Sequence, residues 1–271
     1  MKTASGQSIT LEPWWGTFEL PLGAVRYFRI GPWALWVERR AREIRVSQKQ
    51  HSDPLDTSLT VSQIVDNVAD EPGITSERYA IEGRSVPIQI EPALADRPVV
   101  VRTDEPFHVL ADDEATLYLT TPVWIRVSAG EQKKHLFERP CYRPSDTWFG
   151  RTTREGELCY AGVTTARLTL DELTLRPGRA VTQVRIVNQA RTPLDLDRLN
   201  LPTPALSVFA AADHRLWTEP VQITRDSAGA VQGVTIQKQL SQQARDAVRL
   251  TDPRNQDQDN LFSRAFKALL G

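Results

Sequence analysis

The sequence has few cysteines, no signal-peptide pattern and no long apolar run. Two cysteines, Cys141 and Cys159, are too few for a secreted disulfide framework in 271 residues, and they form no CxxC pair. We therefore expect a reducing, cytoplasmic environment. One lysine followed by polar residues opens the chain, unlike a signal peptide. No window approaches the roughly 18–20 uncharged apolar residues of a membrane-spanning helix, so any membrane contact should be peripheral, through a partner.

The sequence also lacks an excess of charge of one sign. Lysine and arginine number 33 against 34 aspartates and glutamates, for a formal net charge of -1. Because no global field attracts a polyanion, we expect no nucleic-acid partner. Hydrophobic residues at 40% and charged residues at 25% are ordinary for a folded globular chain. The length is enough for one large β architecture or for two domains.

Motifs of common catalytic sites are missing as well. The chain contains no GxSxG, GxxxxGK[ST], GxGxxG or HExxH pattern, and its four histidines are scattered. Acidic neighbours such as Asp104 and Glu105 would point to opposite faces of a strand and so would not form a catalytic pair. The sequence thus predicts no metal, no cofactor and no catalytic residue, although an enzyme is not excluded.

What the sequence does have is a series of short β-branched and aromatic runs, punctuated by 18 prolines and 14 glycines. Prolines this frequent forbid long helices and mark strand ends. The pattern predicts an all-β protein with two antiparallel β-sandwich-like halves. We expect one half in residues 1–140, the other in residues 141–240, and a polar linker with an amphipathic helix in residues 241–271.

The C-terminal segment is the clearest functional hint. Residues 241–250 could form one helix, residues 251–258 have the composition of a linker, and residues 261–270 have helical amphipathic spacing. A helix this short needs a surface to bury against. Three surfaces are open to it: the protein's own sandwich, a protein partner or second copy, or a membrane, which the two basic residues of the polar face, Arg264 and Lys267, favour least. The expected docking residues are Leu261, Phe262, Phe266, Leu269 and Leu270.

Two local features have competing interpretations. Four tryptophans lie near the start of the chain: Trp14, Trp15, Trp33 and Trp36. If their rings are exposed they could stack on sugars, and if they are buried they fill the core. We favour core packing. Arginines gather nearby but are interrupted by Glu38 and Glu43, which favours a solvated strand end over a polyanion site: Arg39, Arg40, Arg42 and Arg45.

A family resemblance rests on the order of several short phrases. They are Trp15-Gly16-Thr17-Phe18, Ile30-Gly31-Pro32, Val37-Glu38-Arg39, Ile90-Glu91-Pro92, Leu119-Thr120-Thr121-Pro122-Val123-Trp124-Ile125, Trp148-Phe149-Gly150 and Gly156-Glu157-Leu158-Cys159-Tyr160. Together they resemble an uncharacterised prokaryotic family, domain of unknown function 432, over most of the chain up to about residue 237. The resemblance implies an all-β fold and no established activity. It also implies a membrane protein as one candidate partner, since some bacterial members are encoded beside mechanosensitive channels.

Within the matched phrases, the best candidate for a special region is the set Trp148, Gly150, Cys159 and Tyr160. The competing interpretation is a tight turn with packing residues, because glycine beside aromatics often marks such turns. As a whole, the sequence predicts a non-enzymatic interaction or regulatory protein, oligomeric or bound to a protein partner, and the resemblance adds a role as accessory to a membrane protein such as a channel. The alternatives are a carbohydrate- or small-molecule-binding sandwich and, third, an unrecognised hydrolase.

Overall fold

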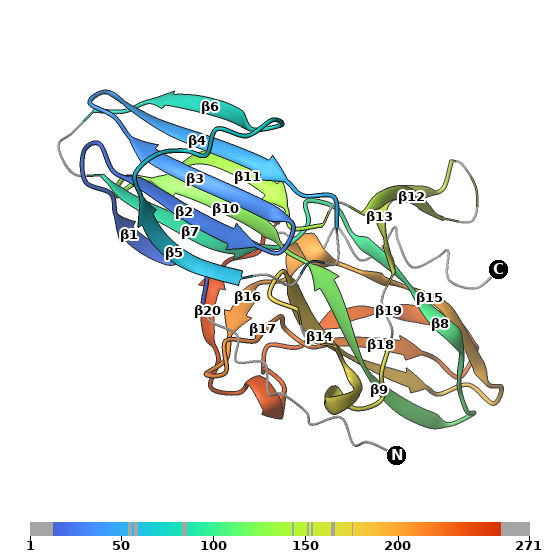
Figure 1. The fold of residues 1–271 in the computed structure, drawn as a ribbon. Coiled ribbons are helices and arrows are strands. Elements are labelled where there is room, and N and C mark those ends of the chain that lie inside the picture. The colour runs from blue at the N-terminus through green and yellow to red at the C-terminus, as the bar shows by residue number, and fades with distance from the viewer. Residues whose placement is uncertain are drawn as a thin grey trace, which may run out of the picture.

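The fold is known from a computed structural model, which describes residues 13–255 apart from 54, 55, 57, 58, 83–85, 143, 151, 153, 164, 165 and 175. These residues form twenty β-strands and three 3-10 helices, η1 (Leu170–Glu172), η2 (Thr203–Ala205) and η3 (Gln242–Ala244), and no α-helix (Figure 1). The expected all-β class is confirmed. No helix in the described part of the chain is long and apolar enough to cross a membrane.

The first sandwich begins with a five-stranded sheet, here sheet B, in the order β5-β2-β3-β4-β6. Its strands are β2 (Val25–Ile30), β3 (Trp33–Arg39), β4 (Glu43–Gln50), β5 (Leu59–Val65) and β6 (Thr75–Ala80). Strands β2 and β3 form a hairpin with Gly31 and Pro32 as its two-residue turn. Gly31 has φ 53°, a conformation that glycine adopts at no steric cost, so the sequence fixes the register of this hairpin.

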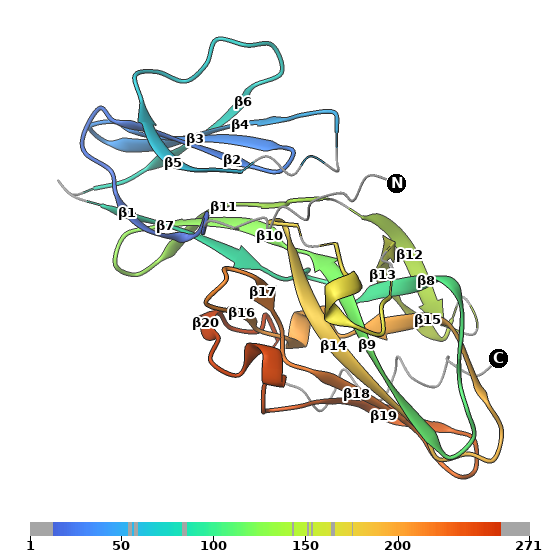
Figure 2. The same ribbon diagram turned by 60° about the horizontal axis from the view of Figure 1, so that its bottom comes forward.

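Opposite sheet B lies sheet A, in the order β1-β7-β10-β11. Its strands are β1 (Gly16–Glu19), β7 (Pro87–Ala93), β10 (Trp124–Ala129) and β11 (Lys134–Pro140). The rings of Phe18 and Phe28 meet between the sheets with centroids 5.5 Å apart. The indole nitrogen of Trp33 donates to the carbonyl of Pro140 at 2.7 Å. Figure 2 shows the two sheets as stacked layers.

The second sandwich consists of sheets C and D. Sheet C has the order β12-β13-β8-β15, with β8 (Val99–Val109), β12 (Ser145–Gly150), β13 (Gly156–Val163) and β15 (Leu194–Leu201). Sheet D contains β9 (Asp113–Pro122), β14 (Arg179–Asn188), β16 (Val208–Ala210), β17 (Leu216–Trp217), β18 (Val221–Arg225), β19 (Val231–Ile236) and β20 (Val248–Thr251). Not every pair is antiparallel as expected, because β13 with β8, and β14 with β17 and β18, run parallel.

The two sandwiches do not divide the strands at residue 140. Strand β8 pairs with β13 and β15, and β9 pairs with β14, although β13, β14 and β15 all follow residue 140. Strands β10 and β11 then return to the first sandwich beside β7. One cluster of buried apolar side chains runs through both sandwiches and includes Phe28 and Ile90 of the first with Val184 and Val221 of the second.

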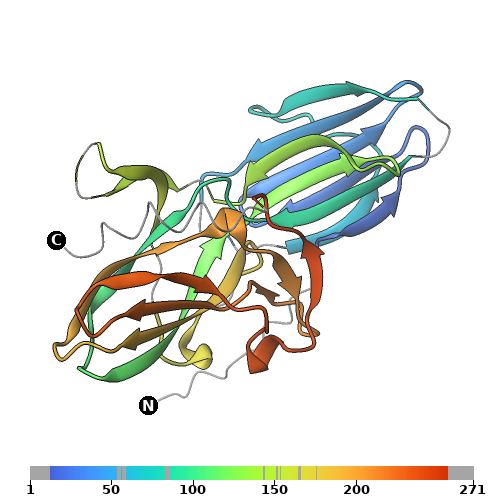
Figure 3. The same ribbon diagram turned by 180° about the vertical axis from the view of Figure 1, so that it is seen from behind.

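The expected helix over residues 241–250 is wrong. This stretch forms η3 and then β20, which pairs antiparallel with β16. Nor do residues 251–255 form a free linker, because Thr251 Oγ1 donates to the carbonyl of Pro92 at 2.8 Å and Arg254 Nε donates to that of Leu94 at 2.7 Å. Seen from behind, the C-terminal strand reaches the first sandwich (Figure 3). The expected helix over residues 261–270 lies outside the described residues.

Candidate interaction site

The four residues singled out in the sequence lie on one β-ribbon, formed by β12 and β13. The two strands pair antiparallel, with Trp148 directly opposite Leu158 and Gly150 opposite Gly156. Strand β12 is the edge of sheet C, so one side of its backbone has no neighbouring strand among the described residues. The ribbon extends beyond the rest of the sandwich in Figures 1 and 3. It therefore places its side chains at the periphery of the molecule.

One face of the ribbon exposes apolar side chains. Trp148 is 42% exposed and Leu158 is 46% exposed, and their direct opposition puts both on the same face. The indole nitrogen of Trp148 donates to the carbonyl of Thr152 at 2.9 Å, which fixes the ring orientation. Large apolar groups that share an exposed surface commonly mark interaction sites, whereas single ones need no explanation.

The opposite face of the ribbon is buried. Phe149 and Cys159 pack with Val100 of β8 in a small apolar cluster, and the guanidinium of Arg198 lies 5.1 Å from the Phe149 ring centroid. Burial, with the nearby Glu157 carboxylate, raises the pKa of the Cys159 thiol to about 12. Cys159 therefore packs in the interior with its thiol protonated, whereas the reactive form of cysteine is the thiolate.

At the tip of the ribbon the two strands approach too closely for any side chain at Gly150. A Cβ atom there would lie 2.0 Å from the carbonyl oxygen of Glu155 and 2.6 Å from the Cα of Gly156. A Cβ at Gly156 would lie 2.8 Å from the Trp148 indole nitrogen, so the Trp148 ring covers this glycine. The Trp-Phe-Gly phrase thus ends where the two strands of the ribbon approach each other most closely.

Tyr160 anchors the base of the ribbon. Its hydroxyl donates to Asp96 at 2.9 Å, and its ring lies 5.7 Å from that of Trp124 and under the guanidinium of Arg97. Burial, followed by the bond to Asp96, raises the pKa of the phenol. The structure thus brings the four predicted residues onto one element but gives them different positions: Trp148 is exposed, while Gly150, Cys159 and Tyr160 shape and hold the ribbon.

Comparison with known proteins gives one match, to the family described as a protein of unknown function (DUF432), over residues 14–270. The chain belongs to this family. No curated protein and no solved structure matches it. The family assignment confirms the resemblance seen in the Trp-Phe-Gly and Gly-Glu-Leu-Cys-Tyr phrases, and it covers the C-terminal segment that the quoted phrases did not reach.

The N-terminal tryptophans lie largely in the interior. Trp14 is fully buried and donates to the carbonyl of Pro177 at 3.0 Å, while Trp36 is buried in sheet B beside Tyr27. Trp15 and Trp33 are half-buried. The core-packing interpretation therefore holds for this cluster. Sugar stacking would need the exposed ring of Trp148 instead.

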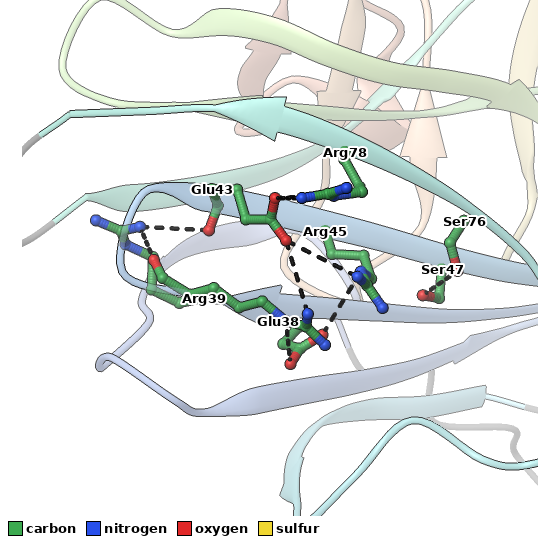
Figure 4. Close-up of polar contacts among 8 residues, drawn as sticks. Glu38, Arg39, Glu43, Arg45, Ser47, Ser76 and Arg78 are labelled. Atoms are coloured by element: carbon green, nitrogen blue, oxygen red, sulfur yellow. Dashed lines mark hydrogen bonds and ion pairs between the residues drawn. The ribbon is translucent and has the colours of Figure 1, made fainter.

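In the arginine-rich turn between β3 and β4, the positive charges are paired with carboxylates (Figure 4). Arg78 Nε donates to Glu43 at 2.8 Å, Arg40 Nε donates to Glu38 at 2.8 Å, and Arg45 lies within 4.0 Å of both carboxylates. The hydrogen bond from Arg78 lowers the pKa of Glu43. Arg39 departs from the expected solvated strand end, because it is 1% exposed and donates to the carbonyl of Glu43.

The described part of the chain shows no group of side chains typical of a metal site or of an activated nucleophile. No three His, Cys, Asp or Glu side chains are grouped there so that they could hold a metal ion. Both cysteines are buried with free thiols, and burial raises the pKa of Cys141. The hydrolase hypothesis gains no support from these residues. The docking residues expected in the last helix, Leu261, Phe262, Phe266, Leu269 and Leu270, lie outside the described residues.

Proposed function

We propose that this protein is a non-enzymatic interaction protein whose binding surface is the exposed face and open edge of the β12–β13 ribbon. The observation that carries the proposal is the coincidence of two features. Trp148 and Leu158 stand side by side and exposed, and Trp148 lies on the edge strand of sheet C. Aromatic side chains that are fixed at an exposed site are the usual anchors of protein interfaces.

The edge geometry indicates how a partner binds. An open strand edge offers a row of backbone donors and acceptors to an extended segment, and alternate side chains give the specificity. Proteins that avoid such pairing place lysine, proline or several charges on the edge strand. Strand β12 reads Ser-Asp-Thr-Trp-Phe-Gly and carries one charge, at Asp146. The partner is therefore an extended segment of another protein with an apolar side chain facing Trp148.

The C-terminal segment belongs to the same proposal, because the described chain ends near the ribbon. The amide of Asn255 donates to the carbonyl of Pro204 at 2.9 Å. The neighbouring Thr203 hydroxyl donates to the carbonyl of Arg97 at 2.8 Å, and the Arg97 guanidinium lies 3.3 Å from Asp146 of β12. We assign a share of partner docking to the apolar residues of the segment, Leu261, Phe262, Phe266, Leu269 and Leu270.

Site-directed photo-cross-linking in the native host tests the proposal. A benzoylphenylalanine replaces Trp148 in one variant and Leu22, which is 65% exposed and lies outside the ribbon, in the control. We expect one defined protein cross-linked from position 148 and absent from position 22. The Leu158→Asp substitution on the opposite strand should abolish that product. Identical products at both positions, or a product insensitive to Leu158→Asp, would refute the ribbon as the binding surface.

The location of the partner and the role of the last segment are separate arms of the same experiment. Cross-linking in detergent-solubilised membranes and in the soluble fraction distinguishes a membrane-protein partner, suggested by the family resemblance, from a cytoplasmic one. Deletion of residues 259–271 should remove the cross-linked product while the circular dichroism of the rest stays unchanged. A deletion variant that keeps the product would restrict the binding surface to the ribbon.

Carbohydrate binding is the second candidate function, favoured by the exposed ring of Trp148 alone. A flat aromatic face held by a hydrogen bond suits stacking on a sugar ring. It predicts a change in tryptophan fluorescence on addition of a glycan, lost in Trp148→Ala and retained in Trp14→Phe. A glycan response that survives Trp148→Ala would exclude this site.

A further inference from the structure

A second surface, unrelated to the ribbon, combines several positive groups at the base of sheet D. Thr120 of β9, Arg176 and Arg179 before and at the start of β14, and His214 with Arg215 before β17 line one small recess. The four basic side chains are each partly exposed, so the recess reaches solvent. Three of its lining residues are arginines from two separate segments of the chain. The folding of the chain, and not a run of charges in the sequence, therefore brings them together.

Arg179 lacks an anionic partner. Its Nε donates to Thr120 Oγ1 at 2.9 Å and its Nη2 donates to the Thr120 carbonyl at 2.7 Å, and both of these acceptors are neutral. Burial lowers the pKa of Arg179 to about 10, and the positive charge of Arg176 acts in the same direction. Among the described residues no carboxylate forms an ion pair with Arg176 or Arg179. Arg179 is partly exposed and has no counter-charge, so an external anion at this point would be favoured.

Two further unsatisfied donors lie on or directly before the neighbouring strand β17, and one of them, on Arg215, belongs to a residue that lines the recess. The parallel pairing of Ala180 with Leu216 puts Arg179 and Arg215 at neighbouring positions of adjacent strands. The Nε of Arg215 and the Nε1 of Trp217 are buried and have no hydrogen-bond acceptor. Trp217 is only 1% exposed, and the Arg215 guanidinium carbon lies 6.0 Å from its ring centroid. Buried donors without acceptors are rare in folded proteins and commonly indicate an ion or water that completes them.

The opposing charges near the recess are few. The carboxylate of Asp213 lies 3.6 Å from Arg215 Nε, which is too long for a hydrogen bond, and its side chain is 57% exposed. The phenol of Tyr142 also acts on Arg179 and raises its pKa. Among the described ion pairs, the three guanidinium groups of the recess meet one carboxylate, that of Asp213. This local excess of positive charge contrasts with the turn between β3 and β4, where the arginines are paired with carboxylates.

The recess is also held in place by its surroundings. Trp14 donates to the carbonyl of Pro177, which lines the recess, and the ring of Trp15 lies 6.5 Å from that of His214. His214 has φ 60°, an unusual conformation for a residue with a side chain, within a turn closed by the bond from its amide to Ala211. Groups fixed in this way before binding lose little entropy when a ligand arrives.

We propose that this recess is an oxyanion site that binds a phosphate group, as free phosphate or as a small phosphomonoester. Guanidinium groups match phosphate oxygens in geometry and form short, charge-assisted hydrogen bonds with them. Arginines from two segments can share the tetrahedrally arranged oxygens and the two charges of one phosphate dianion, whereas chloride is a single atom and acetate has two coplanar oxygens and one charge. One oxygen accepts from Arg179 and Arg215, and Arg176 binds at the mouth.

Isothermal titration calorimetry with inorganic phosphate tests the site, with the full chain at constant ionic strength. We expect saturable binding of phosphate and none of acetate or chloride at the same concentration. Arg176→Ala should raise the dissociation constant at least about tenfold, which corresponds to one lost charge-assisted bond. Arg176 is partly exposed and lies outside the strands, so this variant should remain folded.

Arg191→Ala is the matched control, because Arg191 is an exposed arginine outside the recess and its removal changes the net charge by the same amount. We expect it to bind phosphate like the unchanged chain. Equal heats from phosphate, acetate and chloride, or equal weakening by Arg176→Ala and Arg191→Ala, would overturn the assignment. Phosphate should also raise the melting temperature of the unchanged chain, but not that of Arg179→Gln, relative to chloride.

Discussion

At the residue scale, the closest backbone contact of the ribbon allows a direct test of its architecture. A methyl group at Gly150 would collide with the backbone of Glu155 and Gly156, neither of which can move without separating β12 from β13. We expect Gly150→Ala to lower the free energy of unfolding by about 2 kcal/mol, as forced overpacking typically does. Urea denaturation monitored by circular dichroism measures the change.

The control for that variant is Ser145→Ala, at the exposed other end of the same strand. A substitution there should change the free energy of unfolding by less than about 0.5 kcal/mol. Equal midpoints for the two variants would mean that the tip of the ribbon opens at little cost and that Gly150 is not a structural requirement.

The half-buried carboxyl of Glu157 on the ribbon leads to a prediction about pH. Burial raises the pKa of Glu157 above its ordinary value of 4.5, although the hydrogen bond from Asn200 at 2.8 Å opposes the shift. A raised pKa means that the protonated form stabilises the fold, and this contribution is lost as pH rises through the folded-state pKa. Glu157→Gln keeps an acceptor for Asn200 and removes the charge. Relative to the unchanged chain, the variant should therefore gain stability as pH rises.

Urea unfolding at pH 4 and pH 7 measures this difference. We expect Glu157→Gln to be more stable than the unchanged chain at pH 7, with the gap shrinking toward pH 4. Glu155→Gln, at an exposed carboxylate of the same hairpin, should show no such pH-dependent gap. A gap that is constant with pH would assign the effect to packing instead of titration.

Residue-scale features of the site were only partly predictable from the sequence. The resemblance drew attention to Trp148 and Cys159 but could not separate an exposed ring from a buried thiol, because burial depends on where sheet C ends. The recess around Arg179 left no local signal at all. Arg176 and Arg179 are distant in sequence from His214 and Arg215, and only the pairing of β14 with β17 brings them together.

At the scale of elements, the last described strand, β20, and the residues after it connect the two sandwiches. Thr251 and Arg254 bond to carbonyls of Pro92 and Leu94, Arg254 also forms an ion pair with Glu138, and Asn255 bonds to Pro204. A chain ending at Ala247 loses these contacts together with β20. At about 1 kcal/mol per hydrogen bond, we expect it to lose about 3 kcal/mol of stability.

Thermal and urea unfolding of two shortened chains distinguishes the contribution of residues 248–255 to stability from that of the residues after them. The chain ending at Asn255 keeps every contact just named and should unfold like the full chain, while the chain ending at Ala247 should unfold at lower temperature. If the two shortened chains unfold together, β20 and Arg254 contribute nothing and the stability resides in the earlier strands.

Local patterns identified strands more reliably than their partners. The runs around Val25–Ile30, Trp33–Arg39 and Arg179–Asn188 alternate or are β-branched, and each forms a strand. Residues 241–250 were expected to be helical, since their composition favours a helix, yet pairing with β16 overrides that propensity. The parallel pairing of β14 with β17 and β18 could not be predicted from local sequence either, because the direction of pairing depends on contacts between residues far apart in the sequence.

At the scale of the whole molecule, the interleaving of the chain determines how the sandwiches depend on each other. Strand β9 is paired along ten residues with β14, and β8 is sandwiched between β13 and β15, so the second sandwich needs strands from both sides of residue 140. The first sandwich is completed only when the chain returns through β10 and β11. Trp14, buried against Pro177, adds a contact between the start of the chain and the second sandwich.

This arrangement predicts that the chain cannot be divided at residue 140. A fragment of residues 1–140 contains β8 and β9 without their partners, and a fragment of residues 141–271 lacks β8, one of the two inner strands of sheet C. We expect neither fragment to show the dispersed amide spectrum of a folded protein, and we expect the full chain to unfold in one calorimetric transition because a single apolar core joins both sandwiches. Mixing the two fragments should restore native near-ultraviolet circular dichroism, since the missing strands are then supplied in trans. A folded 1–140 fragment, or two separate transitions in the full chain, would show instead that each half stabilises its own core and that the exchange of β8 and β9 is dispensable.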